Sequence, residues 1–417
     1  MSYLPRHIDT LVQKQLGAMG ALLIRGPKGC GKTETARTFA RSEIVVDDSV
    51  AVKNAMISDP GVLLLGDTPK LIDEWQNQPT LWNTIRHEID RRKTKGQFIL
   101  TGSANPSDDA DLHSGQGRFG IINMRTMTWA EMEYSTDEVR FADLFTKSAL
   151  QSSLISPDLI RLAQRMVRGG WPGNISLNED YATIANDNAF ELLCEVDISR
   201  VDGVRRDPLK VRQLVRSLAR NVSTEASYNT IKQDVWGLQA NLSTDTVIDY
   251  LHALERLMVI ENLPAWSTHI RSKARLRSAS KRHLADTSMA CSALQLSSDK
   301  LIADLEYLGF LFESLVIHDL RIYAELLGGR LYHYRDSNGI EADAILEFRN
   351  GDWAAFEIKL GSGAEDFGAH SLLSLADNID ISKVSPPLAL VVITGDGFAH
   401  HREDGVKVVP FSTLGQQ

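Results

Sequence analysis

Residues 26–33 read Gly26-Pro27-Lys28-Gly29-Cys30-Gly31-Lys32-Thr33. They follow the G-x-x-x-x-G-K-[ST] pattern of a phosphate-binding loop, with an apolar run at 21–24 before them and a helix-like stretch at 34–41 after them. Glycines let backbone N–H groups approach phosphate oxygens, and a helix N-terminus favours negative charge. An ordinary glycine-rich turn would not explain a Gly-Lys-Thr at the helix start. The stretch therefore predicts a nucleotide-binding α/β domain.

The residues around this loop suggest how a nucleotide would be held and hydrolysed. We expect all eight loop residues to contact ATP, with Lys32 on the β- and γ-phosphates and Thr33 on Mg²⁺. Further along, a short apolar run at 70–72 leads into Asp73 and Glu74. In ATPases of this kind the first acid supports the metal, and the second orients or deprotonates the attacking water. Such a pair alone would be an ordinary loop start, but downstream of a phosphate loop we expect the catalytic roles.

Several further residues are candidates for contacts with the γ-phosphate. A third strand, predicted over 97–103, ends at Ser103, which we expect to be a polar sensor; Thr101 and Asn105 are weaker candidates. The alternative there is a plain strand-to-turn transition. Arg118 lies in a glycine-flanked loop and is a candidate arginine finger, acting in cis or from a neighbouring subunit. An ordinary surface arginine is the equal alternative.

Composition sets the outer bounds. The 417 residues are 43% hydrophobic and 24% charged, which is typical of a soluble multidomain protein. No apolar run has the length of a membrane span, and the N-terminal apolar run is a core strand, so we expect a cytoplasmic protein without membrane contact. Cys30, Cys194 and Cys291 have no C-x-x-C spacing, which indicates neither a disulfide framework nor a zinc site. The net charge of −9 argues against a globally basic nucleic-acid binder.

The middle of the chain is predicted to be helical and to end in a winged-helix-like unit. Helical patterns cover 211–219, 228–235 and 244–259, and an extended segment follows at 259–263. The last helix carries more acids than bases, which argues against direct reading of a DNA groove. The unit would then pack against its neighbours instead.

Basic charge is concentrated at 270–282, a run without acidic residues. Such a run is most often a solvated arm or linker. In an acidic protein such a run is also suited to binding the phosphate backbone of a nucleic acid. Contact with DNA through this segment is therefore the alternative that we keep open.

A second set of catalytic-looking residues lies near the C-terminus. Apolar strands predicted at 341–346 and 353–359 would form a hairpin, with Asp343 on the first strand and Glu357 and Lys359 on one face of the second. Glu313 lies on a helix predicted to cover the hairpin. In metal-dependent nucleases such carboxylates hold Mg²⁺ and the lysine orients water or stabilises developing charge. The alternative is a salt-bridged cluster without catalysis.

Taken together, these motifs resemble the bacterial and archaeal AAA-type P-loop ATPases of the AAA_14–DUF4143 family. The resemblance covers nearly the whole chain and is carried by these segments: GPKGCGKT at 26–33, LIDEWQ at 71–76, FILTGSA at 98–104, SGQGR at 114–118, RGGWP at 168–172, FLFES at 310–314, YRDSNGIEADAIL at 334–346 and FEIKLG at 356–361. It implies an ATPase core, a helical and winged-helix middle, and a C-terminal PD-(D/E)-x-K nuclease-like domain. Such ATPases often carry a second arginine sensor, for which Arg165 and Arg168 are the candidates here.

The sequence thus predicts an α/β multidomain protein. We expect a P-loop NTPase domain at 1–145 with helices on both faces of a parallel sheet, a helical region with a winged-helix-like unit at 146–285, and a restriction-endonuclease-like α/β domain at 286–417. The leading hypothesis is a Mg²⁺-dependent ATPase whose nucleotide state controls the C-terminal domain on or near DNA. The alternative is an ATP-dependent switch with an inactive nuclease fold used for binding. A homo-oligomer is expected only if Arg118 acts in trans.

Overall fold

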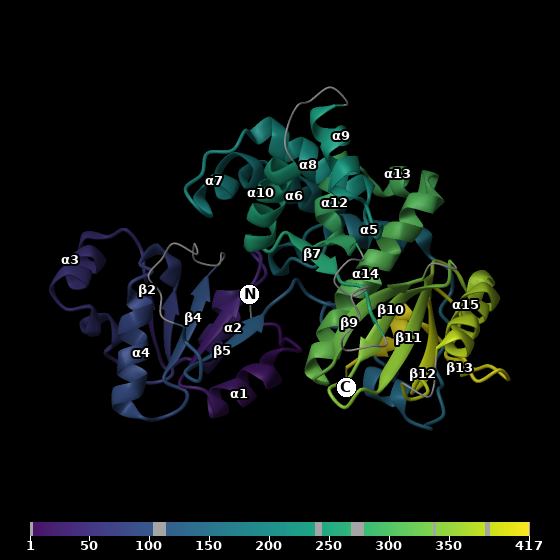
Figure 1. Ribbon diagram of the computed structural model, residues 1–417, viewed down its shortest axis with the longest axis horizontal. Coiled ribbons are helices and arrows are strands. Elements are labelled where there is room, and N and C mark those ends of the chain that lie inside the picture. The colour runs from purple at the N-terminus through teal and green to yellow at the C-terminus, as the bar shows by residue number, and fades with distance from the viewer. Residues whose placement is uncertain are drawn as a thin grey trace.

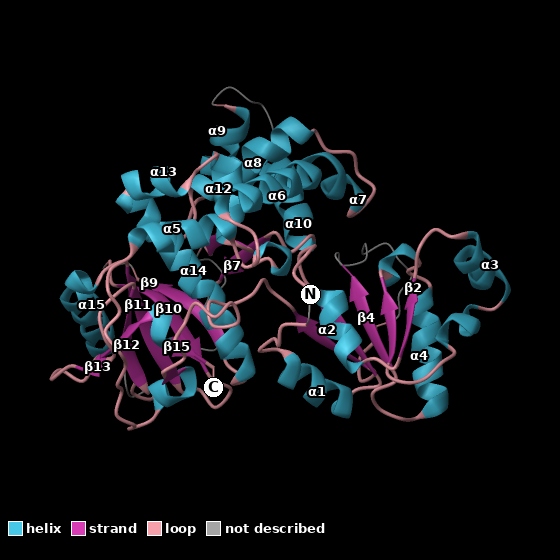
Figure 2. Ribbon diagram, turned by 180° about the vertical axis from the view of Figure 1, so that it is seen from behind, coloured by secondary structure: helices cyan, strands magenta, loops and turns pink. Residues whose placement is uncertain are grey.

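The computed structural model describes residues 3–102, 114–237, 244–267, 279–336, 339–379 and 384–416. Two α/β domains lie on opposite sides of the molecule, and a helical region lies above them (Figure 1). Figure 2 shows the same arrangement from behind. Within the described ranges, no helix is long and apolar enough to cross a membrane.

The N-terminal domain is built on a parallel sheet of five strands in the order β2-β3-β4-β1-β5. The strands are β1 Ala21–Arg25, β2 Ser42–Val45, β3 Lys70–Asp73, β4 Phe98–Gly102 and β5 Phe119–Asn123. The apolar runs predicted as β1, β3 and β4 are confirmed. Because the sheet is parallel, β1, β3 and β4 all end at the same edge, where the phosphate loop begins.

Helices cover both faces of this sheet. They are α1 Asp9–Ala18, α2 Lys32–Phe39, α3 Val50–Ser58 and α4 Leu81–Arg92. Leu22 and Ile24 of β1 pack in one buried cluster with residues of α1 and α2, whereas Ala21 and Leu23 pack in another with residues of α4. This alternation is what a strand buried on both faces requires.

The helical region contains most of the remaining helices. They are α5 Leu159–Arg168, α6 Glu179–Leu192, α7 Ile198–Arg200, α8 Pro208–Arg220, α9 Tyr228–Trp236, α10 Thr244–Arg256, α12 Thr287–Leu294 and α13 Ser298–Ala303, with a π-helical segment, η5 Leu193–Asp197, between α6 and α7. A two-stranded antiparallel ribbon, β7 Ile260–Leu263 and β8 Lys281–Leu284, follows α10. The predicted third helix extended to Val259, which is wrong: the helix ends at Arg256, because Met258 turns the chain with a φ of 57°.

The C-terminal domain is a six-stranded mixed sheet in the order β13-β14-β12-β11-β10-β9. Its strands are β9 Arg330–Arg335, β10 Glu341–Glu347, β11 Trp353–Lys359, β12 Ala389–Thr394, β13 His400–His401 and β14 Lys407–Pro410. The predicted hairpin is confirmed, with Ala344 opposite Phe356. Its two faces are covered by α14 Leu305–Leu326 and α15 Glu365–Asn378: Phe356 packs with α14, whereas Trp353 and Ala355 pack with α15.

Short elements complete the fold. The 3-10 turns are η1 Pro60–Leu64, η2 Trp75–Asn77, η3 Phe141–Phe145, η4 Pro172–Asn174, η6 Ser362–Ala364 and η7 Phe411–Thr413. A small parallel pair joins β6 Val139–Arg140 to β15 Leu414–Gly415.

Two segments pack away from the region to which the sequence assigned them. Residues 139–155 lie against the C-terminal sheet, where Lys407 Nζ donates to the carbonyl oxygens of Leu144 (2.7 Å) and Thr146 (2.9 Å). Conversely, α12 packs on α6 and α8 of the helical region. The packing therefore changes at neither of the two predicted boundaries, 145/146 and 285/286.

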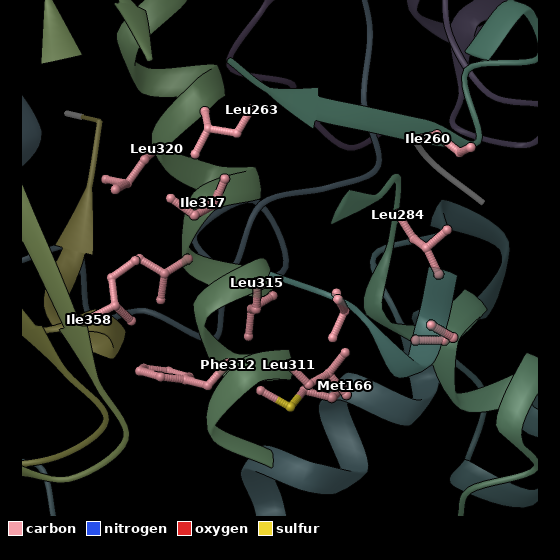
Figure 3. Close-up of a cluster of buried hydrophobic side chains, with 14 of the residues drawn as sticks. Met166, Ile260, Leu263, Leu284, Leu311, Phe312, Leu315, Ile317, Leu320 and Ile358 are labelled. Atoms are coloured by element: carbon pink, nitrogen blue, oxygen red, sulfur yellow. The ribbon is translucent and has the colours of Figure 1, made fainter. Parts of the chain in front are cut away.

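Helix α14 joins the helical region to the C-terminal sheet. Figure 3 shows its two sides: Phe312 and Leu320 lie toward Ile358 of β11, and Leu311 lies toward Met166 of α5. These side chains belong to one buried cluster that extends through both parts of the molecule. Burial of such a shared apolar surface fixes the sheet and the helices against each other.

A buried arginine links all three regions. Arg125 follows β5, and its guanidinium donates to Glu261 of β7 (2.8 Å) and to Glu325 of α14 (3.0 Å for each of two bonds). Only 8% of the Arg125 side chain is exposed, and only 13% of that of Glu261. Removal of one partner from a buried pair leaves an uncompensated charge, which is more costly than the loss of a surface pair.

We expect Arg125→Met to lower the free energy of unfolding by about 2 kcal/mol, mainly because the buried Glu261 carboxylate is left with the longer ion pair to Arg321, at 3.4 Å. Glu325 contributes less because 38% of its side chain is exposed and water screens it. The measurement is urea unfolding of the full chain. Arg91→Met is the control: its pair with Glu88 lies on the surface, so its urea midpoint should stay at the wild-type value. Equal midpoints for the two variants would show that the Arg125 cluster does not stabilise the fold.

Candidate functional site

The phosphate loop is shaped by its glycines. Gly31 has a φ of 102°, in the left-handed region that glycine favours, and α2 begins at the next residue. Gly26 approaches the chain after β5 so closely that a Cβ there would lie 2.1 Å from the carbonyl oxygen of Met124. The loop is thus fixed at both ends, with the N-terminus of α2 behind it. This is the arrangement that binds phosphate in other proteins.

Lys32 is held inside the loop. Its ammonium donates to the carbonyl oxygens of Gly26 and Pro27, at 2.9 Å each, and the residue is buried. A fixed cation among backbone N–H groups attracts phosphate oxygens. The predicted role of Lys32 is therefore compatible with its position.

Thr33 and Asp73 lie side by side, as the sequence predicts for a magnesium site. The Thr33 hydroxyl donates to Asp73 Oδ1 at 3.0 Å, and the Thr101 hydroxyl donates to the same oxygen. A hydroxyl and a carboxylate are oxygen ligands of the kind that Mg²⁺ prefers, so the residues fit the ion. Thr101, a weaker sensor candidate, orients Asp73 instead. Ser103 and Asn105 lie outside the described residues.

Glu74 adopts a backbone conformation that is uncommon for its residue type. Its φ is 55°, in the left-handed region, and its carboxylate accepts a hydrogen bond from the Gln76 side chain. Backbone strain of this kind is concentrated at functional sites. Glu74 also lines the same cavity as Pro27, Lys28 and Gly29 of the loop. The structure thus brings the proposed catalytic carboxylate to the loop.

This cavity, of about 580 Å³, lies between the phosphate loop and the helical region. On the helical side it is lined by Trp171, Phe190 and Leu193, among others. A Cβ at Gly29 would lie 3.8 Å from the Trp171 ring, whose Nε1 donates to the Ser288 hydroxyl at 2.9 Å. The RGGWP segment at 168–172, one of those that carry the family resemblance, therefore contributes Trp171 to a wall of the candidate nucleotide site.

One arginine of this cavity was missed by sequence reasoning. Arg200 of α7 is exposed and lines the cavity together with the phosphate loop. The predicted candidates for a second arginine sensor lie elsewhere: Arg165 stacks on the Tyr134 ring at 3.9 Å, and Arg168 donates to the Tyr134 hydroxyl at 2.7 Å. No local pattern distinguishes Arg200, because only the packing of the helical region brings it to the loop.

Arg118 lies at the wrong edge of the sheet for a role in cis. It directly precedes β5, whose first residue, Phe119, pairs with Ala21 at the start of β1, whereas the phosphate loop follows the end of β1. The Arg118 guanidinium pairs with Asp90 at 2.9 Å. The cis prediction is therefore wrong, because parallel strands place Arg118 and the loop at opposite edges.

The C-terminal candidates converge, and a fifth residue joins them. Lys281 of β8 donates to Glu313 Oε1 (2.8 Å) and to Asp343 Oδ1 (3.2 Å). Lys359 pairs with Glu357 and lies 3.8 Å from Asp343 Oδ2. The four predicted residues thus share one site, beside a pocket of about 420 Å³. Sequence reasoning missed Lys281 here because it stands in the basic run.

Burial and neighbouring charges raise the pKa values of two acids of this site and lower that of the third. Burial raises the pKa of Glu313 to about 8, and the charge on Asp343 adds to this. Burial also raises the pKa of Glu357 to about 7, again reinforced by Asp343. Burial also acts to raise the pKa of Asp343, but the charges of Lys281 and Lys359 outweigh it and lower this pKa. Asp343 is therefore the carboxylate that stays ionised most readily.

The expected Mg²⁺ ligands Glu313, Asp343 and Glu357 do not fit the metal as they are arranged. The two ammonium groups, of Lys281 and Lys359, occupy their oxygens. Over the part of the chain that the structure describes, no cluster of three or more His, Cys, Asp or Glu side chains could hold a metal ion. The predicted C-terminal metal site is therefore corrected to an ion-paired cluster in this conformation.

The basic run at 270–282 is also corrected in part. Lys281 and Arg282 are buried, and Arg282 donates to Asn262 Oδ1 at 2.9 Å and stacks on Tyr228. These two residues are therefore unavailable to DNA. The basic residues at 271–277 lie outside the described residues.

Three family models match separate parts of the chain. Residues 19–133 match an AAA domain, AAA_14, and residues 308–414 match a domain of unknown function, DUF4143. Both were expected from the motifs. Residues 160–300 match another domain of unknown function, DUF8612, which was not anticipated.

Known proteins are similar to this chain at low sequence identity. The uncharacterized proteins Rv2008c of Mycobacterium tuberculosis and Mb2031c of Mycobacterium bovis are each 25% identical over 356 residues, 84% of this chain and 72% of theirs. The Walker-type ATPase PABY2304 of Pyrococcus abyssi covers 70% of this chain and 96% of its own at 13% identity, with a TM-score of 0.43. The Orc1 protein of Aeropyrum pernix in complex with DNA covers 73% and 96% at 14% identity, with a TM-score of 0.25. The matches support an AAA-type P-loop ATPase domain over residues 19–133 and a DUF4143 domain over residues 308–414.

Proposed function

We propose that this protein is a Mg²⁺-dependent ATPase whose nucleotide state controls the C-terminal nuclease-like domain, on or near DNA. The observation that carries the proposal is the convergence of Lys32, Thr33, Asp73 and Glu74 at one edge of the parallel sheet, beside a cavity. The match of residues 19–133 to an AAA domain supports it.

Each residue has a distinct role in this proposal. The loop amides and Lys32 bind the phosphates, and Thr33 and Asp73 hold Mg²⁺, which neutralises phosphate charge when bound. Glu74 takes the proton of the attacking water. Thr101 keeps the Asp73 carboxylate in place through its hydrogen bond.

Control of the C-terminal domain is supported by a chain of buried contacts. Arg6 donates to the carbonyl oxygen of Cys30 in the phosphate loop (2.9 Å) and to that of Arg125 (3.0 Å). The side chain of Arg125 in turn pairs with Glu261 of β7, the neighbour of β8. A change at the phosphate loop therefore has a contiguous route to the strand that carries Lys281.

A second candidate function is favoured by Lys281 itself. In an ATP-dependent switch with an inactive nuclease fold, the C-terminal pocket would recognise a partner rather than cut DNA. An inactive nuclease fold would carry an ammonium group at the oxygens that a metal would need, as Lys281 does at Glu313 and Asp343. The two functions share the ATPase and differ only in the chemistry of the C-terminal domain.

For the ATPase, we expect Glu74→Gln to bind ATP as the wild type does and to turn over at least about tenfold more slowly, because the water loses its base. Lys32→Ala should lose ATP binding. Steady-state hydrolysis and equilibrium binding measure the two effects. Glu88→Gln, in the same domain but away from the loop, is the control and should hydrolyse ATP normally. Unchanged turnover in Glu74→Gln would remove this residue from the mechanism.

For Arg118, we propose a role in trans, since it lies far from the loop of its own chain. Arg118→Ala and Lys32→Ala should each lose most of their turnover alone. A mixture should regain part of it, because Arg118 of one copy would serve the intact loop of the other. A mixture no more active than its components would leave Arg118 as a surface arginine paired with Asp90.

For the C-terminal domain, the two candidate functions predict different results with linear and single-stranded DNA in Mg²⁺ or Mn²⁺. With Lys281 in place we expect no cleavage without ATP. Cleavage that appears with ATP and is lost in Asp343→Ala and Glu357→Ala would support the nuclease. Absence of cleavage during robust ATP hydrolysis would support the switch.

A further inference from the structure

We propose that Lys281 is a built-in cation that takes the place of a divalent metal in the C-terminal site, so that the domain binds no Mg²⁺ while β8 is docked. This inference rests on the proposed nuclease-like architecture of the C-terminal domain, but it does not depend on ATP hydrolysis.

The geometry is that of one cation shared by two carboxylates from different elements. Glu313 comes from α14 and Asp343 from β10, and both direct an oxygen at Lys281 Nζ, at 2.8 and 3.2 Å. Mg²⁺ would need these oxygens at roughly 2.0–2.1 Å in an octahedral arrangement. The ammonium already uses one oxygen of each acid, so the metal and the lysine compete for the same place.

The charge balance of the cluster also disfavours a divalent ion beside its two ammonium groups. Three carboxylates, Glu313, Asp343 and Glu357, face two ammonium groups, Lys281 and Lys359. All five residues are largely removed from water, so repulsion between like charges is strong. A divalent ion added to this set would face two cations and at most one excess negative charge. Without Lys281 the balance would favour its entry.

The strand that carries Lys281 is held in place by its neighbours. Its strand is fixed on both sides: Leu263 pairs with Lys281 across the ribbon, and the backbone N–H of Arg282 donates to Thr224 at 2.9 Å. Two residues on, His283 Nδ1 lies 3.1 Å from the Ser314 hydroxyl of α14. The β7–β8 ribbon therefore holds the backbone of Lys281 beside the two acids.

The direction of the pKa of Lys281 agrees with this geometry. Burial opposes the charge, but Asp343 and Glu313 outweigh it and raise the pKa of the ammonium above its ordinary value. The lysine therefore stays charged in its buried place, as a stand-in for a metal must.

The experiment measures Mn²⁺ binding to the full chain without nucleotide, by electron paramagnetic resonance. Lys281→Met keeps the length of the side chain and removes its charge. We expect it to bind Mn²⁺ at least about tenfold more tightly than the wild type, because the competing cation is gone. Adding Asp343→Asn to Lys281→Met should abolish the gain, which assigns the new ion to this site. Lys300→Met, at an exposed lysine of α13, is the matched control and should bind as the wild type does.

A second comparison does not depend on any Lys281 variant folding. In the otherwise wild-type chain, Asp343→Asn should leave Mn²⁺ binding unchanged, since no metal competes for that carboxylate. Weaker binding in this variant, or no gain in a folded Lys281→Met, would overturn the inference.

ATP turnover of the same preparations separates this inference from the proposed function. Normal turnover without a Mn²⁺ gain would reject only the role of Lys281. A Mn²⁺ gain in a chain that hydrolyses no ATP would support Lys281 as the stand-in and reject the ATPase.

Discussion

Two buried guanidinium groups hold the parts of this molecule in one arrangement. Arg6 reaches the carbonyl oxygens of Cys30, Arg125 and Thr126 and pairs with Glu131 at 3.2 Å. Arg125 extends the contact to β7 and α14. Arginine suits this place because it stays charged and has five donors in a rigid fork. The segment after β5 therefore cannot shift without disturbing both the phosphate loop and the ribbon.

Such contacts specify geometry more than they add stability. Taking a guanidinium out of water costs several kcal/mol, which is recovered only when its carboxylate and carbonyl partners are correctly placed. An apolar contact would tolerate sliding, whereas these pairs do not. This explains why charged residues stand where the ATPase domain meets the rest, whereas one apolar cluster joins the helical region to the C-terminal sheet and two others lie within the ATPase domain. The docked arrangement also forms the cavity that Trp171 and Arg200 line together with the loop.

The sequence predicted what depends on neighbours along the chain. The strand–loop–helix around Lys32, the position of Asp73 at the end of a strand and the Asp343–Lys359 hairpin all follow from local patterns. Residue positions that depend on packing between distant segments were not predicted. Lys281 looked like part of a solvated arm, because its partners stand on α14 and β10, far along the chain. A role of Arg118 in cis stayed open at the level of sequence, since the strand order that places it away from the phosphate loop is not visible there.

The β7–β8 ribbon carries both Glu261, the partner of Arg125, and Lys281, the partner of Glu313 and Asp343. Glu261 pairs with His283 and Leu263 with Lys281 across it, so both ion-paired residues, Glu261 and Lys281, lie on the face turned to α14. A slip of one residue would turn that whole face away, because side chains alternate along a strand. A ribbon placed between two strand registers would leave buried charges unpaired, which is energetically unfavourable. The ribbon thus has discrete positions rather than a continuum. Any signal that reaches Glu261 through Arg125 would release or retain Lys281 as a unit.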